Sequence, residues 1–134
     1  MIADDEGVFE ALATAIALED IESALFYFDP EATFVVFTPA ELVFDGHDGI
    51  RQRLQKLMGD FDVTRFALRT ILPCDEGLRT QIDYAFRHRE SGETIDGVMR
   101  VIASFRDGKI IRWCEYQDAE RVEAFMRLVA RYKK

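Results

Sequence analysis

Two short turn sequences divide the second half of the chain into strands, and they constrain its fold more than any other feature. They are Ser91-Gly92 and Asp107-Gly108. Before the first turn, Leu78–Glu90 alternates apolar and polar residues, and apolar-rich segments, Thr94–Arg106 and Lys109–Gln117, follow the two turns. Alternation with a period of two indicates strands, and Asp-Gly is among the strongest short signals for a hairpin. The sequence therefore predicts a long antiparallel meander.

The first turn sets an expected register for the first pair of strands. A two-residue loop fixes which residues oppose each other across a hairpin. If Glu90 opposes Glu93 across Ser91-Gly92, Asp83 faces Arg100. This pairing predicts an acid beside a base in the middle of a largely apolar sheet.

The second turn brings another acid to the same arginine. If Arg106 opposes Lys109 across Asp107-Gly108, Arg100 faces Glu115. Directly opposed side chains on one face of a sheet lie within interaction range. Charges inside an apolar sheet are costly unless they are paired. We therefore predict a row of Asp83, Arg100 and Glu115, and this row is the main candidate for a catalytic site.

The predicted row has two interpretations. In an apolar cavity, Arg100 would keep one carboxylate ionised, while burial would favour the neutral form of the other, which together give an acid and a base. Alternatively, the three charges form a structural salt bridge that fixes the register of the sheet. Trp113 and Gln81 are expected on the same face. Either they contact a ligand, or they serve as a core aromatic residue and a partner for backbone groups.

Composition bounds the remaining possibilities. The 134 residues, of which 49% are hydrophobic and eleven are phenylalanine, suit one domain, 1–134, with a core large enough to line a cavity. The net charge of −8 argues against nucleic acid and against an anionic membrane surface. No apolar run has transmembrane length, and the acidic start, MIADDEG, is unlike an export signal. Two cysteines, Cys74 and Cys114, make no disulfide framework, so we expect a cytoplasmic protein.

The sequence predicts no cofactor and no metal. It contains no glycine-rich phosphate-binding motif of either common type. His47 and His88 have no cysteine or second histidine at the spacing that zinc ligands show. We interpret His47 as part of a turn that starts a helix, and His88 as a solvated residue near a hairpin end.

The first half of the chain reads mainly as helices, and the fold class is therefore α+β. Helices are expected over Asp4–Leu18, Asp20–Phe28, Gly46–Met58 and Ala119–Arg131, and strands over Ala32–Phe37, Leu42–Phe44 and Phe61–Leu72. The expected outer face of the sheet carries the following residues: Ile82, Tyr84, Phe86, Met99, Val101, Phe105, Ile110, Cys114 and Tyr116. One helical layer covers only one face of a sheet, so we predict a homodimer through this outer face.

Three segments carry a family resemblance over nearly the whole chain. They are FDPEATFVV after the second helix, GHDGIRQRLQKL at the third, and DGKIIRWCEYQDAERVEAF at the end. In this order they resemble the nuclear-transport-factor-2-like superfamily, also called SnoaL-like or ketosteroid-isomerase-like. The resemblance implies a cone, in which a curved antiparallel or mixed sheet wraps around the N-terminal helices and leaves an apolar pocket. Its members include isomerases, polyketide cyclases, epoxide hydrolases and non-enzymatic binding or dimerisation domains.

Two strand segments resemble the limonene-epoxide-hydrolase-like group within this superfamily. Its Arg-x-Asp motif falls on Gln81-Ile82-Asp83, and its Trp-x-Asp motif falls on Trp113-Cys114-Glu115. Gln81 replaces the arginine of the group, and Arg100 is the expected substitute. The residues that hold a water in that group fall near Val36 and Thr38, and Val36 offers no proton acceptor.

The sequence thus predicts a small-molecule-binding protein, with or without cofactor-free acid–base activity on a small apolar organic substrate. As an enzyme it would be a hydrolase, isomerase or cyclase with Asp83, Glu115 and Arg100 as catalytic residues. Trp113, Gln81, Phe34 and Val36 would contact the ligand. The alternative is a non-catalytic ligand-binding or dimerisation domain.

Overall fold

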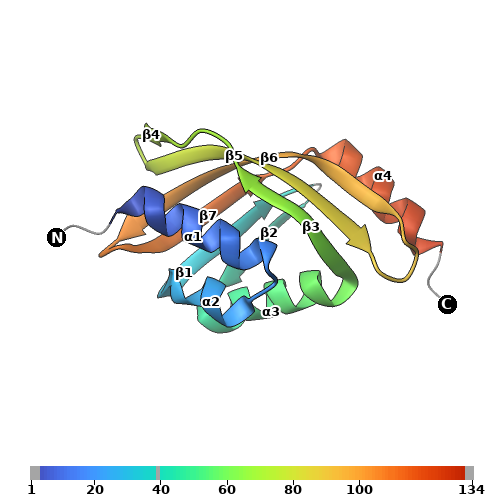
Figure 1. The fold of residues 1–134 in the computed structure, drawn as a ribbon, viewed down its shortest axis with the longest axis horizontal. Helices are drawn as coiled ribbons and strands as arrows, with labels where there is room; N and C mark the ends of the chain where they lie inside the picture. Colours follow the sequence, from blue (N-terminus) through green and yellow to red (C-terminus); the bar gives the residue numbers. More distant parts are fainter. Residues whose placement is uncertain (1–3, 39, 132–134) are drawn as a thin grey trace.

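A computed structural model describes residues 4–38 and 40–131 as an α+β fold (Figure 1). The helices are α1 (Asp5–Ala17), α2 (Ile21–Phe26), α3 (Gly46–Asp60) and α4 (Ala119–Ala130). The strands are β1 (Phe28–Phe37), β2 (Glu41–Asp45), β3 (Phe61–Leu68), β4 (Leu72–Cys74), β5 (Gly77–His88), β6 (Thr94–Arg106) and β7 (Lys109–Tyr116). The predicted element order is confirmed, except that the segment expected as one strand over Phe61–Leu72 divides into β3 and the start of β4.

The seven strands form one mixed, curved sheet. Its order is β2-β1-β7-β6-β5-β3, with β4 paired to β5. All pairs are antiparallel except β1 with β7, which are parallel. This single parallel pair brings the first strand of the chain beside the last, and so places β7 at the centre of the sheet.

Side-chain caps explain where three of the helices begin. Asp4, Asp20 and Asp118 each accept a hydrogen bond from a backbone N–H in the first turn of α1, α2 and α4, respectively. Aspartate is a preferred N-cap because its carboxylate satisfies an N–H group that has no partner within the helix. Pairing with Ser23 lowers the pKa of Asp20 below its ordinary value.

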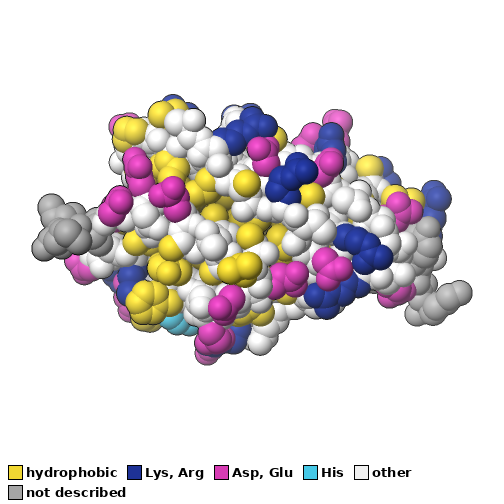
Figure 2. Space-filling model, in the orientation of Figure 1, with side chains coloured by type: hydrophobic (Ala, Val, Ile, Leu, Met, Phe, Trp, Pro, Cys, Tyr) yellow, Lys and Arg dark blue, Asp and Glu magenta, His cyan; other side chains and the backbone are white. Residues whose placement is uncertain are grey.

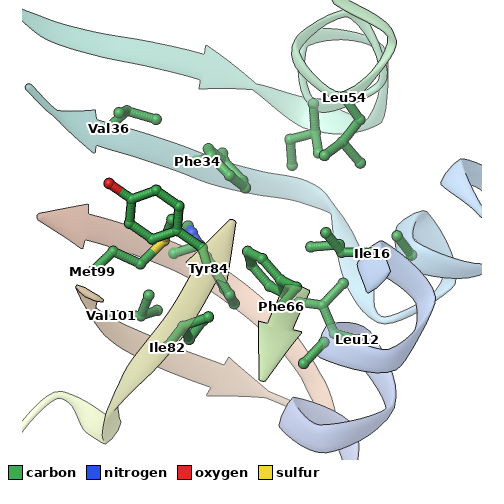
Figure 3. Close-up of a cluster of buried hydrophobic side chains, with 14 of the residues drawn as sticks. Leu12, Ile16, Phe34, Val36, Leu54, Phe66, Ile82, Tyr84, Met99 and Val101 are labelled. Carbon is green, nitrogen blue, oxygen red and sulfur yellow. The ribbon is translucent and has the colours of Figure 1, made fainter. Parts of the chain in front are cut away.

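The core lies between the sheet and the helices α1, α2 and α3. Figure 3 shows side chains from helices and strands pointing toward one another there, among them Leu12, Phe34, Leu54, Phe66 and Ile82. Trp113 is fully buried at the centre of this layer, where its ring stacks on Phe34 with centroids 5.7 Å apart. We call this side of the sheet the inner face and the opposite side the outer face.

The predicted division of the strand residues between the two faces of the sheet was wrong for most of them. The residues predicted for an outer, dimer-forming face include Ile82, Tyr84, Met99 and Val101, and all four are buried in the core of the inner face. The charged row was expected to share a face with the helices. The structure places part of it on the opposite side, for reasons of register described below.

The last helix covers one end of the inner face. Phe125 of α4 packs against Phe61, with ring centroids 6.1 Å apart, and Arg121 donates a hydrogen bond to the Asp96 carbonyl at 2.7 Å. In Figure 1, α4 lies at the opposite end of the sheet from the start of α1. In Figure 2, apolar side chains gather over the middle of the face that carries α1 and β3, and charged side chains of both signs surround them.

Within the part of the chain that the structure describes, no helix combines the length and the apolar character needed to cross a membrane.

Candidate functional site

The first hairpin has a longer loop than its sequence suggested. The amide of His88 donates to the Glu93 carbonyl and the amide of Gly92 donates to the His88 carbonyl, both at 2.8 Å, so four residues rather than two form the turn. As a consequence Arg100 pairs with Gln81, and Asp83 pairs with Val98. The predicted pairing of Asp83 with Arg100 is therefore wrong by two residues, although both stay on the outer face.

The second hairpin has the predicted turn, followed by an irregularity. Asp107 and Gly108 both have positive φ, at 52° and 77°, as the predicted Asp-Gly turn requires, and Arg106 pairs with Lys109. Between Phe105 and Ser104 the register shifts by one, because β7 contains a bulge at Ile111. Beyond the bulge every side chain of β7 exchanges faces relative to the prediction.

The bulge separates Glu115 from the other two charges. Arg100 pairs with Tyr116, and Glu115 pairs with Val101, whose side chain is fully buried on the inner face. The expected row of Asp83, Arg100 and Glu115 does not form. Glu115 lies on the inner face together with Trp113, whereas Asp83, Arg100 and Gln81 lie on the outer face.

On the outer face, Asp83 has a partner that the sequence did not indicate. Arg69 approaches Asp83 with a shortest N···O distance of 2.8 Å, and it also donates to the Gln81 side chain at 3.2 Å. The hydrogen bond from Arg69 holds the pKa of Asp83 below its ordinary value of 3.8. About a third of the Asp83 side chain remains exposed, so this ion pair stands largely in water.

The outer face carries a large hollow. It is an open groove of about 1120 Å³ that includes Arg69, Arg79, Gln81, Arg100 and Tyr116. In the described residues, no ion pair includes Arg79 or Arg100. The groove is therefore an open part of the sheet surface that combines arginine side chains with apolar ones.

On the inner face, Glu115 is a buried carboxylate held by two neutral donors. Only 5% of the residue is exposed. The Trp113 indole Nε1–H donates to Oε1 at 2.8 Å, and the Gln117 amide Nε2 donates to Oε2 at 2.6 Å. The three residues alternate along one strand and its end, so they share a face. No ion pair includes Glu115 among residues 4–38 and 40–131.

This arrangement leaves Glu115 with capacity to bind a further group. An ionised carboxylate has roughly four lone-pair sites and acts only as an acceptor. The indole N–H can only donate, so it holds the oxygen in an acceptor role and fixes the orientation of the carboxylate. Remaining lone pairs can accept a proton or a hydrogen bond from a molecule in the adjacent hollow.

A small hollow adjoins Glu115. It has a volume of about 30 Å³, enough for one or two waters by the usual volume per water. Its lining consists of the following residues: Ile16, Phe34, Arg53, Leu54, Leu57, Phe66, Phe86, Met99, Glu115 and Gln117. Of these, Arg53, Leu57 and Gln117 are partly exposed, whereas the others are buried, so these three stand where the hollow meets solvent.

Three of the four residues expected to contact a ligand lie on this face. Phe34 lines the hollow, Val36 pairs with Glu115 across β1 and β7, and Trp113 binds Glu115 directly. Gln81 is exposed on the outer face and belongs to the groove. The bulge at Ile111 accounts for this division, since it turns Trp113 and Glu115 together toward the side of Phe34.

Sequence reasoning missed three polar side chains near this site. Arg53 lines the hollow from α3, with its guanidinium 5.6 Å from the centre of the Phe44 ring. Gln117 follows β7 and binds Glu115. Tyr84 is buried beside Gly97, where a Cβ atom would lie 3.1 Å from the tyrosine hydroxyl. The alternate spacing of Trp113, Glu115 and Gln117 in the sequence could have predicted the contact between Gln117 and Glu115.

Burial also changes the acidity of Tyr84. Loss of solvent raises the pKa of its phenol above the ordinary value of 10.0. The phenol is therefore neutral near pH 7 and remains a hydrogen-bond donor at this end of the inner face.

The histidines have structural partners. His47 bonds the Phe28 carbonyl through Nε2 at 2.8 Å, consistent with a turn that starts α3. His88 is 6% exposed and bonds Ser91 Oγ at 2.8 Å, so its interpretation as a solvated residue was wrong. No cluster of metal-ligating side chains occurs in the described ranges.

Comparison with known proteins places this geometry in a family. The model of the SnoaL-like domain matches residues 9–113, which is more than half of the chain. The chain therefore belongs to the SnoaL-like domain family, as its sequence resemblance predicted. The matched region ends at Trp113, so Glu115 lies just beyond it. No curated protein sequence matches the chain.

Solved structures share the fold at low sequence identity. A Catenulispora acidiphila protein with a ketosteroid-isomerase-like fold, in complex with trimethylamine, has a TM-score of 0.77 at 14% identity, over 87% of this chain and 89% of its own. A Bacillus subtilis protein provisionally called an isomerase has a TM-score of 0.79 at 17% identity, over 90% and 91%. An NTF2-like protein from Burkholderia thailandensis has a TM-score of 0.79 at 16% identity, over 93% of this chain and 98% of its own. These similarities establish the cone-shaped fold.

Proposed function

We propose that this protein binds a small, largely apolar organic molecule at the inner hollow and uses Glu115 as its acid–base group. The observation that carries the proposal is a buried carboxylate with two neutral N–H donors, no cationic partner in the described residues and a hollow beside it. A carboxylate that served only to fix the sheet would be expected to form an ion pair, as Asp83 does with Arg69.

The chemistry would be proton transfer without a cofactor. Glu115 would remove a proton from a carbon next to a carbonyl, or from a water that attacks the ligand, and would then return the proton to the product. Trp113 and Gln117 would orient the carboxylate through both steps. The family name and the provisional isomerase of Bacillus subtilis are compatible with such chemistry.

The hollow also limits the ligand. Pockets for drug-sized molecules have volumes of roughly 300–1,000 Å³, whereas this hollow has about 30 Å³. The ligand would therefore be small and would enter as the partly exposed side chains of Arg53, Leu57 and Gln117 move. Side-chain rearrangement on binding is common even where the backbone stays fixed.

The test is a ligand screen followed by two matched substitutions. Thermal-shift screening of small lactones, epoxides and cyclic ketones identifies a ligand, and chromatography detects its conversion. Glu115→Gln keeps the shape of the side chain and should lower the rate by about 10²–10⁴-fold. Asp83→Asn makes the same chemical change on the outer face and should leave the rate unchanged. Full activity in Glu115→Gln would contradict the role of Glu115 as the acid–base group. Failure of every compound to bind would contradict the whole proposal.

We further propose that the outer face mediates a homodimer. Val43, Val98 and Tyr116 expose 51%, 38% and 41% of their surface, and the side chains of Arg79 and Arg100 lie in the groove of the same face. A twofold interface places one patch against itself, and this patch carries apolar side chains together with charges of both signs. Sedimentation equilibrium at micromolar concentration should give a dimer. Substitution of Val98 by Glu should give a monomer, and a wild-type monomer would contradict this proposal.

A further inference from the structure

The inner hollow contains a cation that none of the chemistry above uses. Arg53 lines the hollow together with Glu115, in a chain whose net charge is −8. Its guanidinium lies over the Phe44 ring at 5.6 Å. No ion pair includes Arg53 in the part of the chain that the structure describes. The hydrogen-bond donors of the guanidinium are therefore available to a molecule in the hollow.

The placement of Arg53 is set by its helix. Arg53 and Leu57 are four residues apart on α3, so they lie on the same side of the helix, one turn from each other. Leu54, next to Arg53, is buried in the core. Arg53 therefore stands at the boundary between the apolar lining and solvent, where a long side chain keeps its stem on apolar surface and its charge near water.

Arg53 and Glu115 line one hollow without pairing with each other. Opposite charges that share an apolar hollow can both be satisfied by a molecule that bridges them. The geometry points to a small carboxylic acid as the ligand, with its carboxylate on Arg53 and its apolar body among the phenylalanine and leucine side chains. A planar guanidinium binds carboxylates through two parallel hydrogen bonds, which makes arginine well suited to this role.

This inference rests on the proposed function and narrows its substrate class to oxo acids. With the carboxylate of the ligand on Arg53, the carbon next to the ligand's oxo group would point its acidic C–H toward Glu115. Glu115 would take that proton while the C–H electron pair forms an enolate, and return of the proton to the enolate oxygen would complete a keto–enol isomerisation. Arg53 is then the residue that selects an anionic ligand over a neutral one.

The experiment compares a carboxylate with its neutral match. The probes are pyruvate, the smallest oxo acid with an acidic C–H next to its carbonyl, and its neutral amide, pyruvamide, each titrated into the full chain by calorimetry. Wild type should bind the carboxylate about 10- to 100-fold more tightly, as a charge-assisted hydrogen bond allows. Arg53→Gln should abolish this preference and leave the affinity for the amide unchanged. Arg53→Lys should keep part of the preference.

A control on the same helix separates recognition from net charge. Lys56 is exposed and pairs with Asp60, and Lys56→Gln makes the same charge change away from the hollow. It should leave both affinities unchanged. As a check that needs no variant, added salt should weaken binding of the carboxylate to wild type more than binding of the amide, since only the former is an ionic interaction.

The outcomes distinguish this inference from the proposed function. If wild type binds the amide but shows no preference for the carboxylate, or if Arg53→Gln retains the preference, the assignment of Arg53 is overturned while the ligand site stands. If wild type binds neither probe nor any compound of the neutral screen, both are overturned.

Discussion

The two faces of this sheet hold their carboxylates in opposite ways. On the outer face, Asp83 lies about one-third exposed against the guanidinium of Arg69, and that partner lowers its pKa. On the inner face, Glu115 is 5% exposed and held by the neutral N–H groups of Trp113 and Gln117. A surface ion pair is satisfied already and is worth little. A buried acid without a cation is costly to maintain, and this cost is the reason why we propose a function for the inner face rather than for the outer one.

The largest expected difference between the faces is in stability. Trp113 is fully buried and contacts Phe9, Phe28 and Phe34, so Trp113→Ala should lower the free energy of unfolding by about 3–5 kcal/mol. Tyr116→Ala removes an aromatic ring that is 41% exposed on the outer face and should cost much less. Urea denaturation measures both changes. Equal losses would mean that the inner face is not the core.

A second comparison tests the crowding around Tyr84. A Cβ atom at position 97 would lie 3.1 Å from the tyrosine hydroxyl, so Gly97→Ala should destabilise the fold by about 1–3 kcal/mol through overpacking. Removing the hydroxyl in Tyr84→Phe should relieve most of that cost. A double-mutant cycle in urea measures the coupling, and additive losses would contradict the close approach of Tyr84 to Gly97.

Removal of the indole donor should cost less than removal of the whole ring. Trp113→Phe keeps an aromatic side chain but leaves Oε1 of Glu115 without its 2.8 Å hydrogen bond. A buried acceptor that loses its donor costs about 1–3 kcal/mol. The double variant Trp113→Phe with Glu115→Leu should recover part of this loss. If the second change adds to the first instead, the hydrogen bond is not what Trp113 contributes.

The smallest expected effect concerns acid on the outer face. The folded pKa of Asp83 lies below the ordinary value of 3.8, so its ionised form stabilises the fold above that value, and this contribution is lost as the pH falls through the folded pKa. The melting temperatures of wild type and Asp83→Asn should therefore differ slightly near neutral pH and converge below the folded pKa. A difference in melting temperature that grew as the pH fell would contradict a lowered pKa of Asp83.

The sequence predicted nearly every helix and strand, because apolar periodicity and capping residues are local signals. Helix α4 begins at Ala119, as predicted, and Asp107 and Gly108 have the positive φ angles that the predicted turn requires. The faces of the strands were harder to predict. Ile110 and Ile111 are both apolar, so alternation carries no information at the position where the bulge reverses β7.

The candidate site depended on that one position. A single extra residue moved Glu115 to the inner face beside Phe34, and left Asp83 and Arg100 on the other side. Two further partners were also beyond local patterns. Arg69 reaches Asp83 from the loop between β3 and β4, and Arg53 reaches the hollow from α3. Contacts of this kind depend on the register and on helix placement, which no short stretch of sequence encodes.

Trp113 offers a direct test of whether Glu115, rather than Asp83, is the acid on the proposed ligand side of the sheet. The chain has one tryptophan, so a ¹H–¹⁵N spectrum contains a single indole N–H signal, and this N–H donates to Glu115. We expect Glu115→Gln to shift the indole N–H signal strongly and Asp83→Asn to leave it unchanged. A signal that shifts in Asp83→Asn but not in Glu115→Gln would contradict the placement of Glu115 beside Trp113 on the inner face.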